Sequence, residues 1–475
     1  MLIIIGIIRS KSIAVLVGPV GFGVSSILQV SIGMIAGLTN FGLATSAVKE
    51  MSEAFISNDN LKLNKTYSIF FKLLMVTGLF GTFITLIFSS ILSRLSFGNN
   101  NYTWSYLLLS ITLFANQIAV GYSVLLQSFR KTIFLAKSTL YGGIIGLFTV
   151  IPLYYLFTLR AIVPALIISS FTTLALNLYY SRSLSIKYIE IKWHQVFKEG
   201  SVMLKMGFLI SLSSLITLVS SYCLSIFIGK TGGVGDVGLY NAGFAIINTY
   251  VGMIFTAMAT DYYPRLSQVT SDVNSINRTV NQQAEIGLLL LSPIIIVFIL
   301  TVKYIIFLLY SKDFVTINGM LIFAGVGMLF KSVSWSIAFI FLAKGESKKF
   351  FWSELSFNCC MLVLNIIGYK LKGLTGLGIS FLVTYIIYSF QVYIIAKIYF
   401  SFKLDKELIK IFFVNIFISL ITLVVLYFTS SLLLYTLSGI LIIISFVYNL
   451  SSLNKKISLI EIFKKSKNNS QIIYK

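Results

Sequence analysis

The stretch AEIGLLLLSPIIIVFILTV, at residues 284–302, decides the fold of this protein. Apart from Glu285 near its start it has no charged side chain, and an apolar run of about 20 residues can cross the hydrocarbon core of a bilayer as one α-helix. Similar runs recur along the whole chain, so we expect an all-α polytopic membrane protein with about 14 transmembrane helices. The expected spans are residues 1–17, 23–47, 69–92, 104–126, 139–157, 161–180, 206–228, 240–262, 284–302, 317–343, 352–369, 375–396, 411–430 and 434–450.

The overall composition supports the same fold class. Of the 475 residues, 57% are hydrophobic and 11% are charged, and the mean hydropathy is +0.92. An ordinary soluble protein has about 25% charged residues, so a water-soluble surface is excluded. The formal net charge is +22, but the basic residues gather in short links between the apolar runs. That pattern indicates membrane topology rather than nucleic-acid binding, and we expect no nucleic-acid partner.

The basic residues are distributed unevenly between the two sets of links. If the link after the second span is cytoplasmic, the links on that side hold 26 Lys and Arg residues and those on the other side hold seven. Lys and Arg are enriched in cytoplasmic loops. The bias predicts that both termini lie in the cytoplasm.

A weak internal repeat divides the chain into two halves. Six small residues, beginning with Gly18, recur without gaps 215 positions later, beginning with Gly233. The two copies are six helices apart and so have the same orientation, which is typical of a parallel repeat in two-lobed transporters. The predicted parts are a six-helix lobe at 1–180, a cytoplasmic amphipathic linker at 181–205, a second six-helix lobe at 206–400, and two extra helices with a basic tail at 401–475.

The sequence lacks the residues on which many enzyme mechanisms depend. His194 is the only histidine, so a His-dependent triad or a multi-histidine metal site is excluded. The segment at 232–235 is glycine-rich but lacks the Lys-Ser/Thr pair of a P-loop. No link is long enough for a soluble domain, which also argues against a polymerase or ligase of lipid-linked sugars. We therefore expect a transporter that is not an enzyme and that uses no cofactor and no metal.

Cations inside the spans are the main candidates for a binding site, since a charge at membrane depth is costly. Lys331 lies near the middle of the span at 317–343, where it could meet an anionic substrate in a cavity or form a structural ion pair. Arg9 and Lys11 interrupt the first span and suit a phosphate group, which Arg can bind bidentately. The alternative is that translation starts close to Arg9 and that both residues are cytoplasmic anchors.

Two further groups of polar residues could serve transport. Asp261, the deepest acid, is a candidate for ion coupling or gating together with Arg265, and the alternative is an interfacial cap or a pair with Arg265. Among the amides within the spans, Asn116, Gln117 and Asn248 are candidates for lining a cavity that accommodates sugars. Amides that hold helices together would have the same pattern, and the sequence leaves both alternatives open.

Four segments carry a family resemblance. They are Ala14 to Gly23, Ala44 to Glu50, the run from Gly238 to Phe244 that continues through Ala259 to Ser267, and Lys331 to Trp335 followed by Ala343-Lys344-Gly345. Together they resemble the O-antigen and polysaccharide flippases (Wzx type) of the multidrug/oligosaccharidyl-lipid/polysaccharide exporter superfamily. The resemblance covers nearly the whole chain, although the first helix is usually longer in that family.

The resemblance implies a two-lobed fold with a cationic central cavity. It implies that the protein flips an undecaprenyl-diphosphate-linked oligosaccharide, an O-antigen or capsule repeat unit, from the inner to the outer leaflet of the bacterial cytoplasmic (inner) membrane by alternating access. Related lipid II flippases have an Arg at the position that matches Arg9, and a polysaccharide polymerase and chain-length proteins are the implied partners. The alternative is an ion-coupled multidrug or small-molecule antiporter of the same superfamily. Such a carrier of cationic drugs should have buried acids in the N-terminal lobe, and residues 69–180 contain none.

Overall fold

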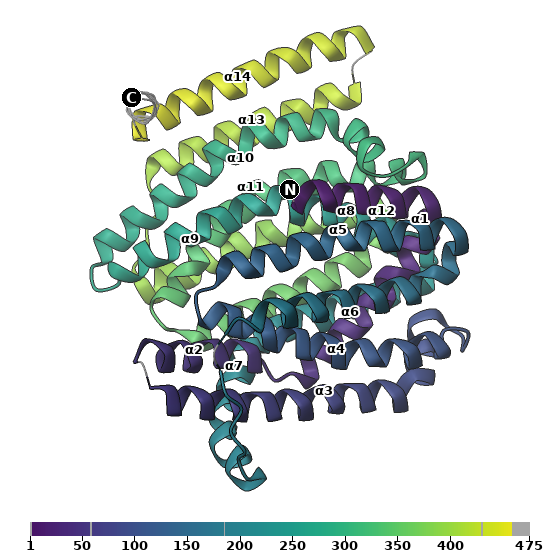
Figure 1. Ribbon diagram of the computed structural model, residues 1–475. Helices are drawn as coiled ribbons and strands as arrows, with labels where there is room; N and C mark the ends of the chain where they lie inside the picture. The colour runs from purple at the N-terminus through teal and green to yellow at the C-terminus, as the bar shows by residue number, and fades with distance from the viewer. Residues whose placement is uncertain (1, 58, 185, 429–430, 458–475) are drawn as a thin grey trace, which may run out of the picture. The chain divides into compact units, whose positions relative to one another are not determined.

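The computed structural model describes residues 2–57, 59–184, 186–428 and 431–457 (Figure 1). Within these ranges the chain is helical and has no β-strand, and 11 helical segments are long and apolar enough to cross a membrane. Three of these segments each contain two of the predicted spans, separated by a break in the helix. The predicted all-α polytopic fold is confirmed. Residue 1, the end of the 411–430 span and the basic tail from 458 onwards lie outside the described residues.

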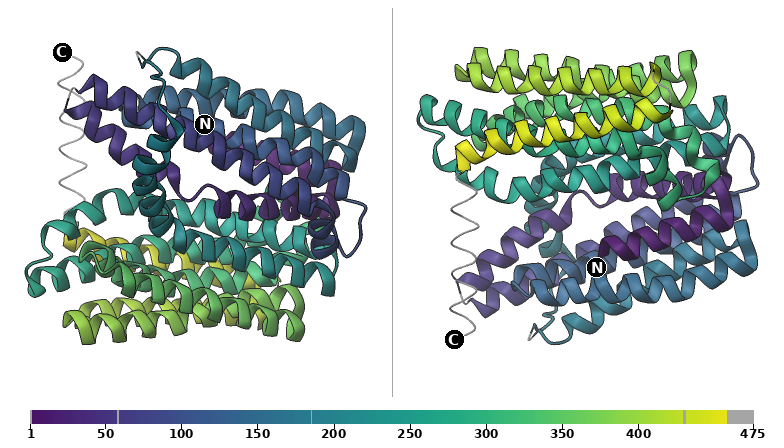
Figure 2. Two further views of the ribbon diagram at one scale, coloured as in Figure 1. Left: turned by 90° about the horizontal axis from the view of Figure 1, so that it is seen from below. Right: turned by 90° about the horizontal axis from the view of Figure 1, so that it is seen from above.

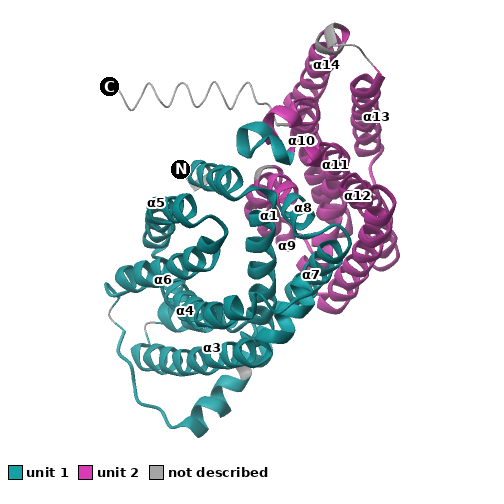
Figure 3. Ribbon diagram, turned by 90° about the vertical axis from the view of Figure 1, so that its right-hand side faces the viewer, with its two compact units in different colours: residues 1–241, 307–314 teal, residues 242–306, 315–475 magenta. Residues whose placement is uncertain are grey.

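The contacts within the chain define two compact units (Figure 3). The first comprises Met1–Asn241 and Phe307–Phe314, and the second comprises Ala242–Ile306 and Val315–Lys475. The six-helix lobes at 1–180 and 206–400 and the linker at 181–205 stay a prediction.

The first unit is a bundle of long helices. They are α1 (Leu2–Thr39), α2 (Leu43–Ile56), α3 (Asn60–Phe97), α4 (Thr103–Ser128), α5 (Thr132–Phe157), the 3-10 turn η1 (Thr158–Ala161), α6 (Ile162–Ser181), α7 (Trp193–Thr231) and the beginning of α8 (Val234–Ile246). Helix α4 packs against α3 and α6, and α1 packs against α5 and α7. Buried Leu28 and Tyr106 belong to an apolar cluster that joins α1 and α4 to α3, α5 and α6.

Helix α1 bends sharply, and this bend shapes the first unit (Figures 1 and 2). Gly18 has φ 63° and ψ −171°, a backbone conformation that side chains with a Cβ rarely adopt, and Pro19 follows it without an N–H to donate. The spans predicted at 1–17 and 23–47 are therefore the two straight parts of one helix. The second span was predicted too long, because α1 ends at Thr39 and Gly42, at φ 61°, turns the chain into the separate helix α2.

The second unit begins within α8, at Ala242, and includes the end of that helix. It contains the π-helical turn η2 (Ile247–Val251), α9 (Gly252–Gln268), α10 (Val273–Leu309) as far as Ile306, the second half of the 3-10 turn η3 (Lys312–Ile317), α11 (Asn318–Ala343), α12 (Ser347–Phe400), α13 (Lys406–Phe428) and α14 (Ser431–Ile457). Figures 1 and 3 show α13 and α14 side by side, and Asn449 Nδ2 donates a hydrogen bond to Asn415 Oδ1 between them at 3.0 Å. The last turn of α14 also carries Lys456, which forms an ion pair with the buried Glu285 of α10.

Helix α12 contains the spans predicted at 352–369 and 375–396. It breaks at Lys372 and Gly373, where the glycine has φ 55°. Its two halves pack back against each other so closely that Gly368 and Gly376 leave no room for a Cβ atom. Small residues permit such close helix contacts inside a membrane. Helix α12 also packs against α11, which carries Lys331.

Candidate functional site

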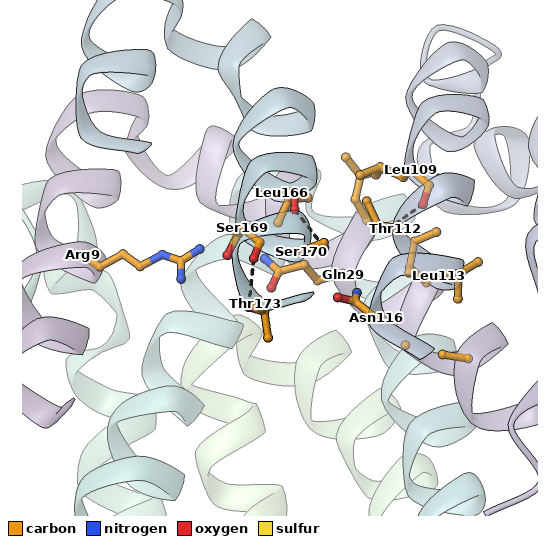
Figure 4. A pocket seen from close by; sticks show the side chains of 14 residues that line it. Arg9, Gln29, Leu109, Thr112, Leu113, Asn116, Leu166, Ser169, Ser170 and Thr173 are labelled. Carbon is orange, nitrogen blue, oxygen red and sulfur yellow. Dashed lines mark hydrogen bonds between the residues drawn. The ribbon is translucent and has the colours of Figure 1, made fainter. Parts of the chain in front are cut away.

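A polar cavity of about 350 Å³ lies inside the first unit, between α1, α4 and α6 (Figure 4). The bend at Gly18 lets both parts of α1 line it, since Arg9 comes from the first part and Gln29 from the second. Thr112 and Asn116 line it from α4 because residues four apart share a helix face. Helix α6 adds three hydroxyl groups, those of Ser169, Ser170 and Thr173.

The hydrogen bonds within the cavity wall determine what it offers to a ligand. Thr112 Oγ1 donates to the carbonyl of Leu109 at 2.6 Å, and Thr173 Oγ1 donates to the carbonyl of Ser169 at 2.9 Å. A hydroxyl whose proton is used in this way keeps its lone pairs as acceptors. The side chain of Asn116 makes no hydrogen bond to any described residue, so its amide can both donate and accept. The wall therefore matches the donors and acceptors of sugar hydroxyls.

Arg9 supplies the positive charge of this cavity. Its side chain is half-buried, and Figure 4 shows its guanidinium pointing towards Ser169 and Gln29. No described carboxylate lies within 4.0 Å of it, and no acid lines the cavity. A guanidinium with no counter-ion in a polar cavity is suited to bind an anion such as a phosphate.

Lys11 and Gln117 lie near this cavity in sequence but do not line it. Lys11 is half-buried on the first part of α1. Gln117 follows Asn116 and is therefore rotated by about 100° around α4. Its Nε2 atom donates to Thr77 Oγ1 of α3 at 3.1 Å. The structure thus gives Gln117 a contact between helices and leaves Asn116 facing the cavity.

The second unit holds Lys331 among aromatic rings. Its Nζ atom lies 5.5 Å from the centre of the Phe255 ring on α9 and 5.6 Å from that of Tyr385 on α12. The Phe255 ring packs edge-on against Trp335, with 5.4 Å between ring centres. Aromatic faces attract a cation through their quadrupoles, and they exclude water around it. Phe255 and Tyr385 belong to two other helices, and the sequence alone did not predict their contact with Lys331.

An acid lies in the same region, yet it does not form an ion pair with Lys331. Glu354 of α12 accepts a hydrogen bond from the Tyr388 hydroxyl at 2.7 Å. Among the described residues no carboxylate oxygen lies within 4.0 Å of the Lys331 ammonium group. The charge of Glu354 still acts on Lys331 from a greater distance. The ammonium group can therefore meet an anionic ligand without first breaking a salt bridge.

The remaining candidates lie on the helical segment 247–268 of the second unit. Arg265 donates from Nη2 to Gln283 Oε1 of α10 at 3.1 Å, and its buried Nε atom has no hydrogen-bond partner among the described residues. Asp261 is exposed, one turn away, and forms no salt bridge with Arg265. Asn248 is exposed on the π-helical turn η2. The structure does not bring these three side chains together.

Sequence reasoning missed most of the cavity wall. Ser169, Ser170 and Thr173 were not among the candidates, whereas Gln29 was one of the amides for which a cavity wall and a contact between helices both stayed open. A polar stripe was nevertheless visible in the sequence, because Ser169 and Thr173 are spaced four residues apart within an apolar span. Which span this stripe faces depends on how the helices pack.

The chain is similar to a known protein family and to individual known proteins. A family model described as polysaccharide biosynthesis protein matches residues 13–318. The lipid III flippase of Escherichia coli (strain K12) is 22% identical over 398 residues, which cover 81% of this chain and 92% of that protein. The lipid III flippase of Shigella flexneri has the same identity and coverage.

Two solved structures share the fold. One is the lipid II flippase MurJ in an inward closed conformation, with a TM-score of 0.65 and 16% identity over 94% of this chain and 99% of that chain. The other is an inward-facing multidrug resistance MATE family transporter of the MOP superfamily, with a TM-score of 0.67 and 16% identity over 84% of this chain and 95% of that chain. The TM-scores show that the three proteins share a fold, and at 16% identity the likeness shows the fold alone.

Proposed function

Because the chain belongs to the family of polysaccharide biosynthesis proteins, we propose that it is a flippase for a lipid-linked oligosaccharide. The substrate is an undecaprenyl-diphosphate-linked repeat unit of O-antigen or capsule, which moves from the inner to the outer leaflet of the bacterial cytoplasmic membrane by alternating access. The observation that carries this proposal is the cavity of the first unit, where one unpaired guanidinium lies among hydroxyl and amide groups.

The chemistry of the substrate explains the need for such a wall. A diphosphate cannot enter hydrocarbon without compensation, since burying an unpaired charge is very costly. Arg9 binds a phosphate oxygen pair, and Asn116, Thr112 and Ser169 exchange hydrogen bonds with sugar hydroxyls. The lipid tail stays in the bilayer and needs no polar wall.

Lys331 provides a positive charge in the second unit, and it is proposed to bind the same class of anion. The aromatic rings of Phe255 and Tyr385 hold the ammonium group in place. Lys11 is proposed as a supporting cation on the first part of α1. Asp261 and Arg265 remain candidates for ion coupling or gating, and Asn248 for a polar contact with the sugars.

The multidrug antiporter alternative receives less support from the cavity. A carrier of organic cations needs a carboxylate to replace the water that solvates its substrate. The residues that line the cavity include one cation and no acid. An anionic headgroup fits this arrangement, and an organic cation is repelled by it.

The topology and partners follow from the same proposal. Both termini lie in the cytoplasm, and a reporter fused after Lys475 should give a cytoplasmic signal. A polysaccharide polymerase and chain-length proteins use the flipped repeat unit on the far side of the membrane.

A lipid-flipping assay tests the proposal directly. The full-length protein is placed in liposomes with a fluorescent undecaprenyl-diphosphate oligosaccharide, and an impermeant reductant bleaches the label in the outer leaflet. We expect the protein to expose all of the label rather than the outer-leaflet part alone. Arg9→Gln should slow this exposure, whereas Arg94→Gln should not, because Arg94 is an exposed residue that bonds to Asn100 at 2.9 Å away from the cavity.

Two results would contradict the proposal. One is an inner-leaflet label that stays protected in the presence of folded protein. The other is transport of a cationic dye such as ethidium with no movement of the lipid, which would support the antiporter alternative.

A further inference from the structure

We infer that the segment joining α6 to α7 is a docking surface for anionic lipid headgroups. We call it the linker surface, and it includes the first turns of α7. Its members are Lys187, Tyr188, Lys192, Trp193, Phe197 and Lys198. The inference does not depend on what the protein transports.

The linker surface is fixed rigidly to α3. The backbone N–H of Lys187 donates to Asn64 Oδ1 at 3.0 Å, and that of Ile189 donates to Ser68 Oγ at 2.8 Å. Lys72 donates from Nζ to the carbonyl of Ile191 at 2.6 Å and lies 4.9 Å from the centre of the Trp193 ring. These bonds determine the position of the linker surface along the axis of α3.

That position is the boundary of the hydrocarbon core. The α3 residues that hold the linker, from 64 to 72, bracket residue 69, where the apolar span of this helix is expected to begin. Figure 1 shows the first turns of α7 running crosswise to α3 and projecting beyond it, and Figure 3 shows the same projection from another side. Since α3 crosses the membrane, a helix crosswise to it at this depth lies in the plane of the membrane surface.

The exposed side chains suit that location. Tyr188, Trp193 and Phe197 are 51%, 52% and 52% exposed. The rings of Trp193 and Phe197 stack with 6.1 Å between their centres, one helical turn apart. Aromatic side chains are enriched at the level of lipid headgroups, where one end of the ring is apolar and the other is wet.

Charge selects the kind of headgroup. Lys187, Lys192 and Lys198 are exposed, and none has a described carboxylate within 4.0 Å. Glu199 forms a salt bridge with Lys65 at 2.7 Å. Among the described residues of the segment, Glu190 is then the acid that has no salt bridge. Basic residues beside an interfacial helix attract anionic lipids electrostatically. The combination of three lysines with three exposed rings therefore fits an anionic lipid surface.

Fluorescence quenching by brominated lipids tests this inference on the full-length protein in nanodiscs. One sample of nanodiscs contains brominated phosphatidylglycerol and unlabelled phosphatidylcholine. The other contains unlabelled phosphatidylglycerol and brominated phosphatidylcholine. The contribution of Trp193 is the difference between the parent protein and Trp193→Phe. We expect phosphatidylglycerol to quench Trp193 at least about twofold more strongly, because the lysines concentrate it there.

Matched lysine variants separate this site from general attraction to a basic protein. The triple variant Lys187→Gln/Lys192→Gln/Lys198→Gln should bring the quenching ratio close to one. The control variant Lys403→Gln/Lys406→Gln/Lys410→Gln removes the same charge elsewhere and should leave the ratio unchanged.

Three outcomes would overturn the inference. If neither lipid quenches Trp193, this residue lies outside the bilayer, and the linker surface would then fit an acidic protein partner. Equal quenching by both lipids in the parent protein would show an aromatic anchor without charge selection. A preference for phosphatidylglycerol that survives in the triple linker variant would show that these lysines do not create it.

Discussion

The surroundings of Arg9 and of Lys331 show two ways in which a helical membrane protein holds a positive charge. Arg9 points into a cavity of about 350 Å³ whose other polar groups are hydroxyls and amides. Lys331 lies between the rings of Phe255 and Tyr385, and its neighbour Ser332 has a buried hydroxyl with no hydrogen-bond partner among the described residues. Hydroxyl and amide groups surround the charge of Arg9, whereas the charge of Lys331 faces aromatic rings, which stabilise a cation more weakly.

The less polar surroundings of Lys331 predict that it acts more strongly on an anion than Arg9 does. Two unit charges 4 Å apart interact with about 1 kcal/mol in water and about 4 kcal/mol at the effective dielectric constant of a partly buried site. The aromatic surroundings also make the charge of Lys331 costly for folding, because a charge without a close counter-ion among apolar rings is poorly solvated. A stronger effect on transport and a larger folding cost are therefore expected at the same residue.

We expect the largest changes in the rate of lipid flipping when each cation is replaced by a neutral side chain. Lys331→Met should slow lipid flipping by up to about a thousandfold, and Arg9→Met by about fivefold, following the two dielectric limits. Lys331→Met should also raise the melting temperature, since it removes a poorly solvated charge. Flipping rates in liposomes and thermal unfolding of the same samples measure both effects.

Lys303→Met is the control, because Lys303 is exposed on α10 and is not part of either site. Equal losses of transport for Lys331→Met and Arg9→Met would break the comparison. A fall in the melting temperature of Lys331→Met would show that its charge stabilises the fold through the distant Glu354.

Exchanging arginine and lysine at the two positions tests whether the geometry of each cation matters in addition to its charge. Arg9→Lys should lower the flipping rate by less than the loss of about fivefold expected for Arg9→Met, since a lysine keeps the charge but cannot make the paired hydrogen bonds of a guanidinium. Lys331→Arg should retain part of the activity, because the aromatic rings also accept a guanidinium on their faces. Full activity of Arg9→Lys would show that only the charge of Arg9 matters.

The adjacent amides test whether the cavity wall binds the substrate. Asn116→Leu should slow flipping several-fold without loss of stability, because Asn116 makes no hydrogen bond to the described protein. Gln117→Leu should instead lower the free energy of unfolding by about 0.6 kcal/mol, the average value of a hydrogen bond between transmembrane helices. The reverse pattern, measured by flipping and by denaturation of purified protein, would exchange their roles.

Ionic strength gives the smallest expected effect. The Debye length falls from about 10 Å at 0.1 M salt to about 3 Å at 1 M salt, and screening acts mainly on charges in contact with water. The ratio of parent to Arg9→Met activity should therefore decrease with salt, while the ratio of parent to Lys331→Met activity should change less. An equal decrease in both ratios would mean that Lys331 is as hydrated as Arg9.

Much of the fold could be predicted from the sequence because each membrane-spanning helix leaves a local signal. An apolar run as long as 284–302 has no other stable position than a helix in the bilayer. The bends of α1 and α12 were also detected as boundaries between spans, since Gly18, Pro19 and Gly373 interrupt helices locally. The end of the second span at Thr39 was missed, because residues 40–47 after it carry no charged side chain.

The candidate site was predictable only in part. Arg9, Asn116 and Lys331 were identified because a charge or an amide inside an apolar run is unusual in itself. Gln117 has the same local signal as Asn116, yet it contacts Thr77 on α3 rather than the cavity. Ser169 and Thr173 have a weaker signal, since serine and threonine often donate to their own helix and need no partner elsewhere.

Three properties could be read from the amino-acid order alone: the α-helical membrane fold, the approximate position of each helix along the chain, and the rare charged residues within the helices. These properties depend on the free energy of moving each local segment from water to lipid. The packing of the helices brings Arg9 to the hydroxyl groups of α6 and places Lys331 between rings of α9 and α12. Such neighbours are distant in sequence, and the rotation of each helix about its axis is determined by how all of its neighbours pack against it.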